Sequence, residues 1–349
     1  MAKAPATVLE VPQGPGSPQA RQVRLSSPDR VMWPEAGVTK EDLARYVLAA
    51  GPLLVDALAD RPVTLQRFPG GVDGEAFYSK NPPRGVPEFM RTVAVTYPSG
   101  RSHDQLVVDE VAGALWAVQM NTVTFHPWPV RTGDVDRPDQ MRIDLDPQPG
   151  RGFADAVEAA FVLREVLADA GLTGWPKTSG NRGVHVDVVV RPDHEFLVVR
   201  HAVIALAREL ERRVPDLVTT AWWKEERGER VFVDFNQAAR DRTLASAYSP
   251  RPLPHAPVSW PLAWDDLRGA DPADFTVRTA PGLLAARDDP RAGMADAAGD
   301  LGTLMGWWER DLANGQGEMP FPPDYPKMPG EPPRVQPSRK NAANWADGE

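Results

Sequence analysis

The chain has 349 residues, of which 42% are hydrophobic and 25% charged, and its formal net charge is -9 at pH 7. This length can build one large domain or two ordinary ones, and no apolar run approaches the roughly 18 residues that a membrane span needs. Cysteine is absent, which excludes disulfides, thiol catalysis and thiolate zinc sites. The acidic balance argues against indiscriminate nucleic-acid binding, but it leaves room for a local basic groove.

Residues 1–22 are rich in Pro, Gly and Ala and lack the apolar core of a signal peptide, so we expect a flexible leader. A first helix is predicted to start at Thr39 and to continue through residues 40–58, because Glu41 and Asp42 suit a first turn. Strand and helix patterns then alternate along the chain. We expect strands at 61–69, 122–128, 141–147, 183–190 and 230–237, a hairpin at 89–109 with its turn at 98–100, and helices at 110–120, 153–171 and 201–214.

The stretch MRIDLDPQPG, residues 141–150, places two aspartates one residue apart at the end of an apolar run. On a strand, residues i and i+2 point to the same face about 6 to 7 Å apart, so Asp144 and Asp146 would project together. Their charges repel, and a bound divalent cation would offset that repulsion because Mg²⁺ and Mn²⁺ favour carboxylate oxygens. The alternative is a solvated strand end before a proline turn.

A second motif is KTSGNRGVHV, in which Ser179, Gly180 and Gly183 form a tight turn. Such a turn can bring backbone N–H groups to an anion, and Arg182 and His185 would add further donors. A plain hairpin turn is the structural alternative.

A third motif begins where Asp234 ends an apolar strand, and Gln237, Arg240, Arg242 and Arg251 follow it. Taken singly, each of the three motifs has an ordinary structural explanation. Their combination fits a metal-bound triphosphate, with three carboxylates for divalent ions, donors for phosphates and strands that hold both.

In this order, IDLDP, TSGNRGVHV and VFVDFNQ…YSPR resemble the three motifs of the polymerase domain of bacterial ligase D proteins, members of the archaeo-eukaryotic primase superfamily. The resemblance extends over roughly residues 25–285 and includes SPDRVMWPEAGVTKEDL, LQRFPGGVDGEAFYSKN, TFHPW and DFTVRTAPGLL. It implies an α+β, primase-like fold in which two mixed or antiparallel sheets, flanked by helices, surround a central catalytic cleft.

The resemblance also implies how the chain is organised. After the leader, residues 23–300 would form the primase-polymerase domain, and 301–349 a C-terminal helix with a Pro-rich tail that packs on the surface or is partly disordered. No ligase or nuclease domain fits in the remainder, so the sequence resembles a stand-alone member.

Roles in catalysis and nucleotide binding follow by matching residues to the family's motifs. Asp144, Asp146 and Asp234 match metal-binding carboxylates, and Arg227 resembles a mobile loop arginine that engages the catalytic centre when DNA is bound. Gln66 stands where some members carry a lysine, and Arg182 where the family usually has one. The residues that match nucleotide contacts are Gln66, His126, Ser179, Arg182, His185, Gln237 and Arg251.

The resemblance assigns a second group of residues to DNA. Arg30 and Lys40 match two basic residues that hold a 5′-phosphate across a gap, and Phe77 and Tyr78 match a pair that stacks on the template strand. If this segment is a regular strand, Phe77 and Tyr78 face opposite ways and cannot both stack. Lys80 and Lys224 complete the expected DNA contacts.

The function implied by the resemblance is template-directed nucleotidyl transfer that extends primers and fills short gaps in DNA repair or end joining. The reaction would use two Mn²⁺ or Mg²⁺ ions and NTP or dNTP substrates, with a preference for ribonucleotides. The implied partners are gapped or primer–template DNA with a 5′-phosphate, bacterial Ku and a separate DNA ligase, with no membrane. The implied location is the bacterial cytoplasm, at the nucleoid during repair.

Three other functions stay open at this point. A de novo primase would share the three carboxylates and would also hold an initiating nucleotide. A catalytically inert module could use the same fold to bind DNA ends with 5′-phosphates. A metal-dependent phosphohydrolase could use the acidic cluster, although it would not need the donors of the Ser179 turn or Arg251.

Overall fold

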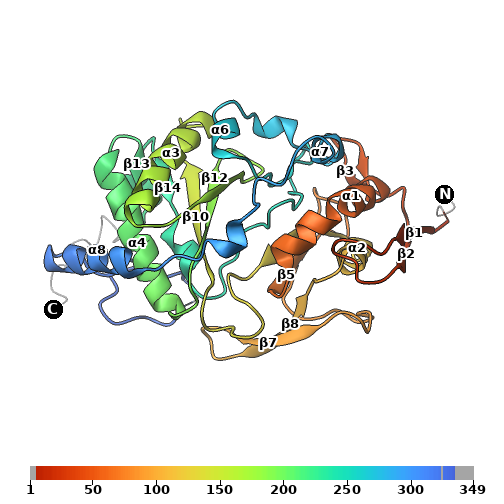
Figure 1. The fold of residues 1–349 in the computed structure, drawn as a ribbon, viewed down its shortest axis with the longest axis horizontal. Helices are drawn as coiled ribbons and strands as arrows, with labels where there is room; N and C mark the ends of the chain where they lie inside the picture. The colour runs from red at the N-terminus through yellow and green to blue at the C-terminus, as the bar shows by residue number, and fades with distance from the viewer. Residues whose placement is uncertain (1–4, 324, 335–349) are drawn as a thin grey trace, which may run out of the picture.

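The computed structural model describes residues 5–323 and 325–334, and these residues form an α+β fold. They contain two five-stranded sheets: an N-terminal sheet from residues 62–127 and a C-terminal sheet from residues 140–233. The two sheets occupy the two halves of the molecule in Figure 1, so the chain completes one sheet before it builds the other.

The N-terminal sheet is organised around one central strand, β5. Its strands are β5 (Pro62–Arg67), β6 (Phe77–Ser79), β7 (Thr92–Thr96), β8 (Ser102–Val107) and β9 (Thr122–Pro127). β9 pairs with β5 along most of the length of β5, and β6 and β8 pair with the two ends of β5. β7 forms a hairpin with β8, and all these pairs are antiparallel.

Two helices accompany this sheet, α1 (Lys40–Leu58) and α2 (Val111–Gln119). Thr39 caps α1, because its hydroxyl accepts a hydrogen bond from the Asp42 N–H while the Asp42 carboxylate accepts one from the Thr39 N–H. α1 and α2 pack closely: a Cβ atom on Gly51 would lie 2.6 Å from a methyl carbon of Val111. α2 in turn contacts β9, which places this helix pair beside the sheet.

The C-terminal sheet carries the acidic motifs. Its strands are β10 (Gln140–Pro147), β11 (Trp175–Thr178), β12 (Val184–Val189), β13 (Val218–Thr219) and β14 (Val231–Val233), in the spatial order β11, β12, β10, β14, β13. All neighbours are antiparallel except β13 and β14. The register pairs Asp144 with His185 and Leu145 with Val233, so β10 lies between the other two motifs.

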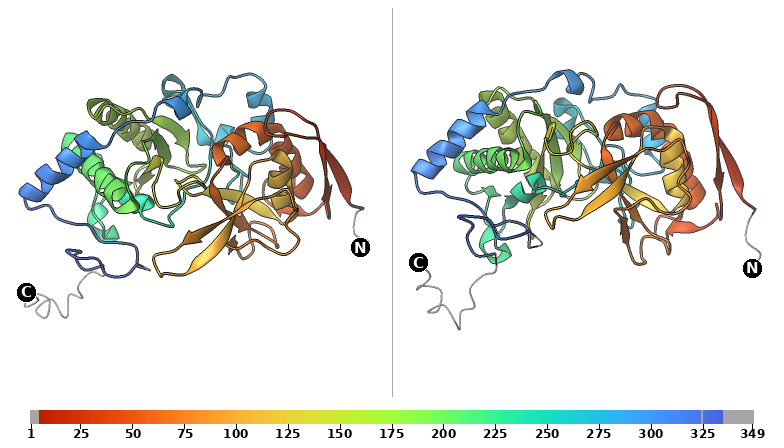
Figure 2. Two further views of the ribbon diagram at one scale, coloured as in Figure 1. Left: turned by 60° about the horizontal axis from the view of Figure 1, so that its bottom comes forward. Right: turned by 90° about the horizontal axis from the view of Figure 1, so that it is seen from below.

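Helices α3 (Phe153–Asp169) and α4 (Phe196–Arg213) pack against one face of the C-terminal sheet, and α8 (Gly302–Ala313) packs on α4. Alternation along β10 turns Ile143 and Leu145 into this core and leaves Asp144 and Asp146 on the opposite face. Figure 2 shows α3, α4 and α8 together on one side of the molecule, away from the N-terminal sheet.

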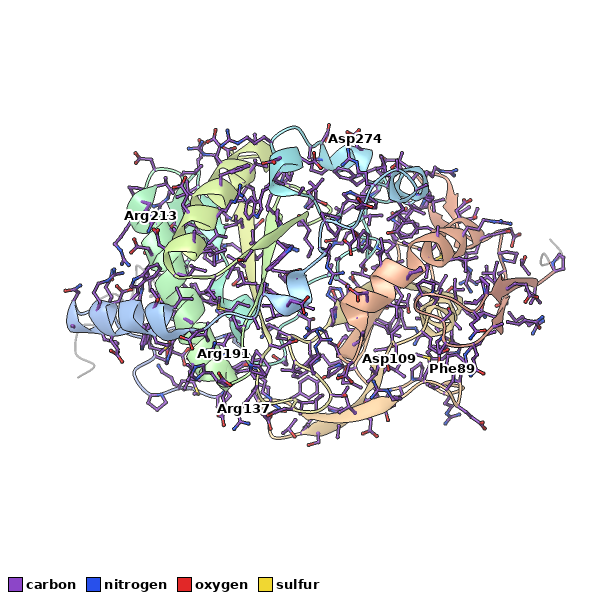
Figure 3. The ribbon with its side chains drawn as sticks, in the orientation of Figure 1. Phe89, Asp109, Arg137, Arg191, Arg213 and Asp274 are labelled. Carbon is purple, nitrogen blue, oxygen red and sulfur yellow. The ribbon has the colours of Figure 1, made fainter. Side chains whose placement is uncertain are left out.

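Short elements connect these parts. They are β1 (Thr7–Val11), β2 (Arg21–Leu25), β3 (Val31–Trp33), β4 (Val38–Thr39), α5 (Lys224–Arg227), α6 (Trp264–Leu267), α7 (Ala280–Leu284) and the 3₁₀ turns at Phe235–Ala238, Pro272–Asp274 and Met294–Asp296. Surface arginines tie several elements together. Arg213 at the end of α4, labelled in Figure 3, pairs with Asp169 at the end of α3.

The helices and strands predicted in the central region are present, with differences in their bounds. The helix predicted at 201–214 begins earlier, at Phe196. The strand expected at 230–237 ends at Val233, because the Asp234 carboxylate accepts a hydrogen bond from the Asn236 N–H and starts a 3₁₀ turn. The leader expected at 1–22 contains β1, which pairs with β2 from residue 7 onward. The C-terminal helix is α8, and the tail beyond it is described up to residue 334; residues 335–349 lie outside the described part.

None of the helices in the described residues is long and apolar enough to cross a membrane.

Candidate active site

Three carboxylates come together where β10 and β14 lie side by side. The Asp234 N–H donates to the Asp144 carbonyl at 3.1 Å, and Asp146 follows Asp144 on the same face of β10. All three residues line one pocket of about 330 Å³. Its other lining residues are Trp222, Lys224, Arg227, Phe232, Asn236, Gln237, Arg242, Pro322 and Pro323.

The carboxylates repel one another, as their spacing in the sequence predicts. Burial, followed by the charges of Asp234 and Asp146, raises the pKa of Asp144 to about 8, against the opposing charges of Lys177 and Arg251. Burial also raises the pKa of Asp234. Negative charge therefore concentrates here beyond what nearby cations of the protein neutralise.

This donor set fits a divalent cation in its chemistry, because hard cations prefer carboxylate oxygens and would neutralise the excess charge. Within the described ranges, however, no group of three or more His, Asp or Glu side chains stands close enough to form a complete metal site. Two carboxylates are instead engaged by amides: Asp146 accepts from Gln148 at 3.1 Å, and Asp234 from Gln237 at 2.9 Å. Gln237, expected at the nucleotide, thus holds a carboxylate in this structure.

The second motif forms the turn between β11 and β12. The Ser179 hydroxyl accepts hydrogen bonds from the N–H groups of Asn181 and Gly183, both at 3.2 Å, so the turn is closed on itself. Gly180 has φ +78°, and a Cβ on Gly183 would lie 2.7 Å from the Leu145 carbonyl oxygen. Arg182 is exposed at the tip of this turn.

His185 lies beneath the turn and contacts both an acid and a base. Its Nε2 is 3.5 Å from Asp144 Oδ1, and its Nδ1 is 2.6 Å from the ammonium nitrogen of Lys177. Burial, followed by the charge of Lys177, lowers the pKa of His185 well below its usual value, so the ring is neutral near pH 7. Lys177, the buried lysine of the KTSG segment, was not among the site residues predicted from the sequence, whereas His185 was.

Arg251 faces these residues from the segment after the third motif. Its charge acts on Asp144, His185 and His126, which places the guanidinium among them. Among the described residues, the buried Arg251 Nε has no hydrogen-bond partner. A buried guanidinium N–H without a hydrogen-bond partner is a donor available to an anionic ligand.

The N-terminal sheet contributes a polar cluster. Gln66 on β5 donates to the Tyr78 hydroxyl at 3.0 Å, and its carbonyl oxygen is 3.3 Å from His126 Nε2. Burial, followed by the charge of Arg251, lowers the pKa of His126 to about 3. His126 is therefore neutral near pH 7 and able to donate or accept a hydrogen bond.

Arg227 and Lys224 reach the pocket from α5. The Arg227 guanidinium lies 3.4 Å over the Phe232 ring and donates to the carbonyls of Ala221 and Trp222. Burial lowers its pKa, while Asp234 and Asp146 raise it. Lys224 is exposed at the rim. Both residues line the same pocket as the three carboxylates.

The first two residues expected to contact DNA, Arg30 and Lys40, differ from each other, and Lys40 does not match the expectation. Arg30 is exposed, but Lys40 is only 2% exposed, and its ammonium donates to Ser26 O and to both Gln119 O and Oε1. Burial, followed by the charge of Arg30, lowers the pKa of Lys40 to about 8. In this structure Lys40 is a buried anchor and not a free phosphate ligand.

The aromatic pair lies on β6 and points to opposite faces. Both residues are exposed, Phe77 by 50% and Tyr78 by 57%. The Tyr78 hydroxyl accepts a hydrogen bond from Gln66, and its ring centroid lies 6.0 Å from that of His126. The two rings do not share one face, as the strand alternation predicts. Lys80 lies with its ammonium 4.7 Å from the Tyr97 ring of the neighbouring hairpin.

Two arginines that follow the third motif, Arg240 and Arg242, lie in different places. Arg242 lines the pocket, but Arg240 turns away and pairs with Asp136, while its Nε donates to the carbonyl of Thr96 on β7. Sequence reasoning missed Lys177, Asn236 and the two prolines of the tail that line the pocket, Pro322 and Pro323. A lysine inside an otherwise apolar strand is the one signal that could have identified Lys177; the tail carries no such signal.

Three comparisons with known proteins agree. The family model described as the LigD primase-polymerase domain matches residues 39–291. The multifunctional non-homologous end joining protein LigD of Mycolicibacterium smegmatis is 32% identical over 262 residues, covering 74% of this chain and 34% of the relative. That of Pseudomonas aeruginosa is 32% identical over 300 residues, 84% of this chain and 35% of the relative. The chain spans about a third of the length of these relatives.

A solved structure gives the same result. The polymerase domain of Mycobacterium tuberculosis ligase D in complex with DNA is 30% identical and superimposes with a TM-score of 0.72, covering 79% of this chain and 99% of that domain. The family-model match, residues 39–291, includes the three motifs around Asp144, Ser179 and Asp234.

Proposed function

Because the chain belongs to the LigD primase-polymerase domain family, we propose that it is a template-directed nucleotidyltransferase that extends primers and fills short gaps in DNA end joining. Its fold is the archaeo-eukaryotic primase-like fold expected from the sequence. The observation that carries the proposal is the pocket lined by Asp144, Asp146 and Asp234. Arg251 supports it, because its charge acts on Asp144 and its buried Nε has no hydrogen-bond partner among the described residues. Carboxylates and an arginine donor together suit a nucleoside triphosphate with divalent cations.

Asp144, Asp146 and Asp234 would hold the divalent cations, which supply Lewis-acid activation of the primer hydroxyl and of the triphosphate. The protein's own groups position the substrates. Arg251 would donate to the triphosphate, and the closed turn at Ser179 would set the backbone near it. Arg227 and Lys224, at the rim of the pocket, would add positive charge where the DNA backbone approaches.

A preference for ribonucleotides is part of the proposal, and the cluster of Gln66, His126 and Tyr78 supports it. A neutral His126, buried beside Arg251, can hydrogen-bond a 2′-hydroxyl, which a deoxyribonucleotide lacks. Gln66 would orient the ring through its carbonyl oxygen. The proposed partners are gapped DNA with a 5′-phosphate, the end-binding protein Ku and a ligase.

The experiment is primer extension on a short-gapped duplex with NTP or dNTP, in Mg²⁺ and in Mn²⁺. The control is the Asp144→Ala, Asp146→Ala double variant. We expect extension by the wild-type chain and none by the control. Extension that persists in the control would overturn the assignment of the carboxylates. Binding of the gapped duplex without extension in any condition would favour the inert end-binding module, and products on unprimed single strands would favour a primase.

A further inference from the structure

The segment that follows α8 lies against the active site although it falls outside the family match, which ends at residue 291. We call residues 315–323 and 325–334 the strap. Figure 2 shows it leaving the end of α8 and looping below α4 toward the short helix α5. Seven of its residues are prolines, at positions 320, 322, 323, 326, 329, 332 and 333, so much of its backbone is restricted before folding.

Arg200 on α4 fastens the strap. Its side chain is 1% exposed, and it donates to the Glu318 carboxylate and to the carbonyls of Met319 and Pro320. The guanidinium lies 3.8 Å from the Phe321 ring of the strap. Glu318 also meets His201 Nε2 at 2.7 Å, so one carboxylate joins the strap to two residues of α4.

The same arginine reaches the turn that carries Asp234. Arg200 Nε and Nη2 donate to Asn236 Oδ1, each at 3.2 Å, and Asn236 Nδ2 donates to the Pro320 carbonyl at 3.1 Å. The Asn236 backbone N–H holds Asp234 Oδ1 at 3.1 Å. A continuous chain of hydrogen bonds therefore runs from Glu318 through Arg200 and Asn236 to the carboxylate.

The strap also forms part of the pocket wall. Pro322 and Pro323 line the same pocket as the three carboxylates. Beyond them, the Trp222 indole N–H donates to the Arg334 carbonyl at 3.2 Å, which ties the strap to the segment before Arg227. The strap thus both lines the pocket and is bonded to Trp222, another of its lining residues.

We propose that the strap is a positioning element for Asp234, with Glu318 and Arg200 as its positioning residues. By fixing Asn236, these two residues hold the Asp234 carboxylate in the orientation that divalent-cation binding needs. The inference rests on the proposed function for its cations, but the strap with Glu318 lies outside the matched family region, whereas Arg200 and Asn236 lie inside it. Outer hydrogen-bond partners of metal ligands usually set both the orientation and the affinity of the site.

The test measures binding of Mn²⁺ alone, without nucleotide or DNA, by the electron paramagnetic resonance signal of the free ion. The variants are Glu318→Gln, which keeps the shape and removes the charge, and Arg200→Lys, which keeps the charge and removes the fork to Asn236. The matched control is Glu110→Gln. Glu110 also binds an arginine, Arg21, and is similarly buried, with 15% of its side chain exposed against 11% for Glu318.

We expect each strap variant to raise the Mn²⁺ dissociation constant about tenfold, the lower end of the range for outer partners of metal ligands, and the control to leave it unchanged. Thermal unfolding of all three variants reports any general loss of stability. Unchanged Mn²⁺ affinity in both strap variants would overturn the inference, and so would an equal loss in Glu110→Gln. Primer extension is measured separately. A chain that binds Mn²⁺ but never extends a primer would refute the proposed function, and the Mn²⁺ affinities of the strap variants would still test the inference.

Discussion

The ammonium nitrogen of Lys177 lies 2.6 Å from Nδ1 of His185, in the buried layer beneath the Ser179 turn. The ammonium group has three N–H donors and three acceptors around it. Besides His185 Nδ1, these acceptors are Ala245 O and Ser259 Oγ, each at 2.9 Å. Lys177 therefore donates to Nδ1 and fixes the ring proton on Nε2, the atom that faces Asp144 at 3.5 Å. Through this contact, Lys177, which does not line the pocket, selects the tautomer that His185 presents to Asp144.

Replacing Lys177 with Met should release this tautomer. The variant keeps the length of the side chain but leaves His185 Nδ1 and the Ala245 carbonyl without their donor, at a cost of about 1–3 kcal/mol of stability. The ¹⁵N–¹H correlations of the imidazole rings should show His185 as the Nε2–H form in the wild type and as a mixture in the variant. The His185→Gln variant assigns the signal. An unchanged tautomer in Lys177→Met would contradict the relationship.

A second prediction follows from the raised pKa of Asp144. A carboxyl whose pKa is higher in the folded state stabilises the fold below its unfolded pKa of about 4, and this contribution is lost as the pH rises through about 8. His126 and His185, whose pKa values are lowered, act in the opposite direction, but only below the unfolded pKa of about 6.5. Without metal, stability should therefore fall between pH 6.5 and 8.

The measurement is urea unfolding in a chelator at several pH values in that window, for the wild type and Asp144→Asn. The variant removes the ionisation, so its stability should change less with pH and exceed that of the wild type at pH 8. Added Mn²⁺ should stabilise the wild type most at pH 8 and the variant little. Parallel pH profiles for the two proteins would show that Asp144 ionises normally.

The sequence could predict the strands that carry the motifs because their patterns are local. Alternation over residues 141–147 puts Asp144 and Asp146 on one face, and the apolar run before Asp234 ends at the third carboxylate. Contacts between distant segments leave no such pattern. Lys40 is a surface cation by its type, and only the approach of Ser26 and Gln119 buries it.

The tail shows the same limit. The prolines of the tail indicate irregular backbone. No local pattern, however, predicts that Pro322 lines a pocket whose aspartates lie some 90 to 180 residues earlier in the chain. The strand boundary at Val233 was also missed, because the Asp234 carboxylate caps a 3₁₀ turn that the apolar pattern does not reveal. Such features depend on tertiary hydrogen bonds and on single side-chain caps.

Arg251 should serve the nucleotide and not the DNA. Removing its donors in Arg251→Ala would cost a charged hydrogen bond, about 1.5–3 kcal/mol, and should raise KM for the nucleotide about 10- to 100-fold. Arg240→Ala is the matched control, because Arg240 turns away from the pocket and pairs with Asp136. Affinity for gapped DNA, measured by fluorescence anisotropy, should stay unchanged in both variants. An equal loss of nucleotide and DNA binding in Arg251→Ala would assign it to the DNA.

His126 should set the choice of sugar. His126→Ala removes the group proposed to meet the 2′-hydroxyl, so kcat/KM for NTP should fall by the value of one hydrogen bond, about 2- to 10-fold, while that for dNTP changes little. Tyr78→Phe is the comparison, since it removes the hydroxyl that Gln66 contacts and leaves the imidazole in place. If both sugars suffer equally in His126→Ala, the residue shapes the pocket without reading the sugar.

Replacing Arg30 and replacing Lys40 should have different effects, because Arg30 is exposed whereas Lys40 is buried and donates three hydrogen bonds. Lys40→Met should lower the free energy of unfolding by about 1–3 kcal/mol, since it leaves the carbonyl oxygens of Ser26 and Gln119 unpaired. Arg30→Ala should leave stability unchanged and reduce the salt dependence of binding to a gapped duplex by about one phosphate contact.

The assay compares duplexes with and without a 5′-phosphate at the gap, over a series of salt concentrations, alongside urea unfolding of each variant. Binding by Lys40→Met should retain its preference for the 5′-phosphate once the variant is measured under folded conditions. If that preference disappears in Lys40→Met while stability stays at the wild-type value, the lysine leaves its buried position to meet the phosphate. Its hydrogen bonds to Ser26 and Gln119 would then belong only to the DNA-free state.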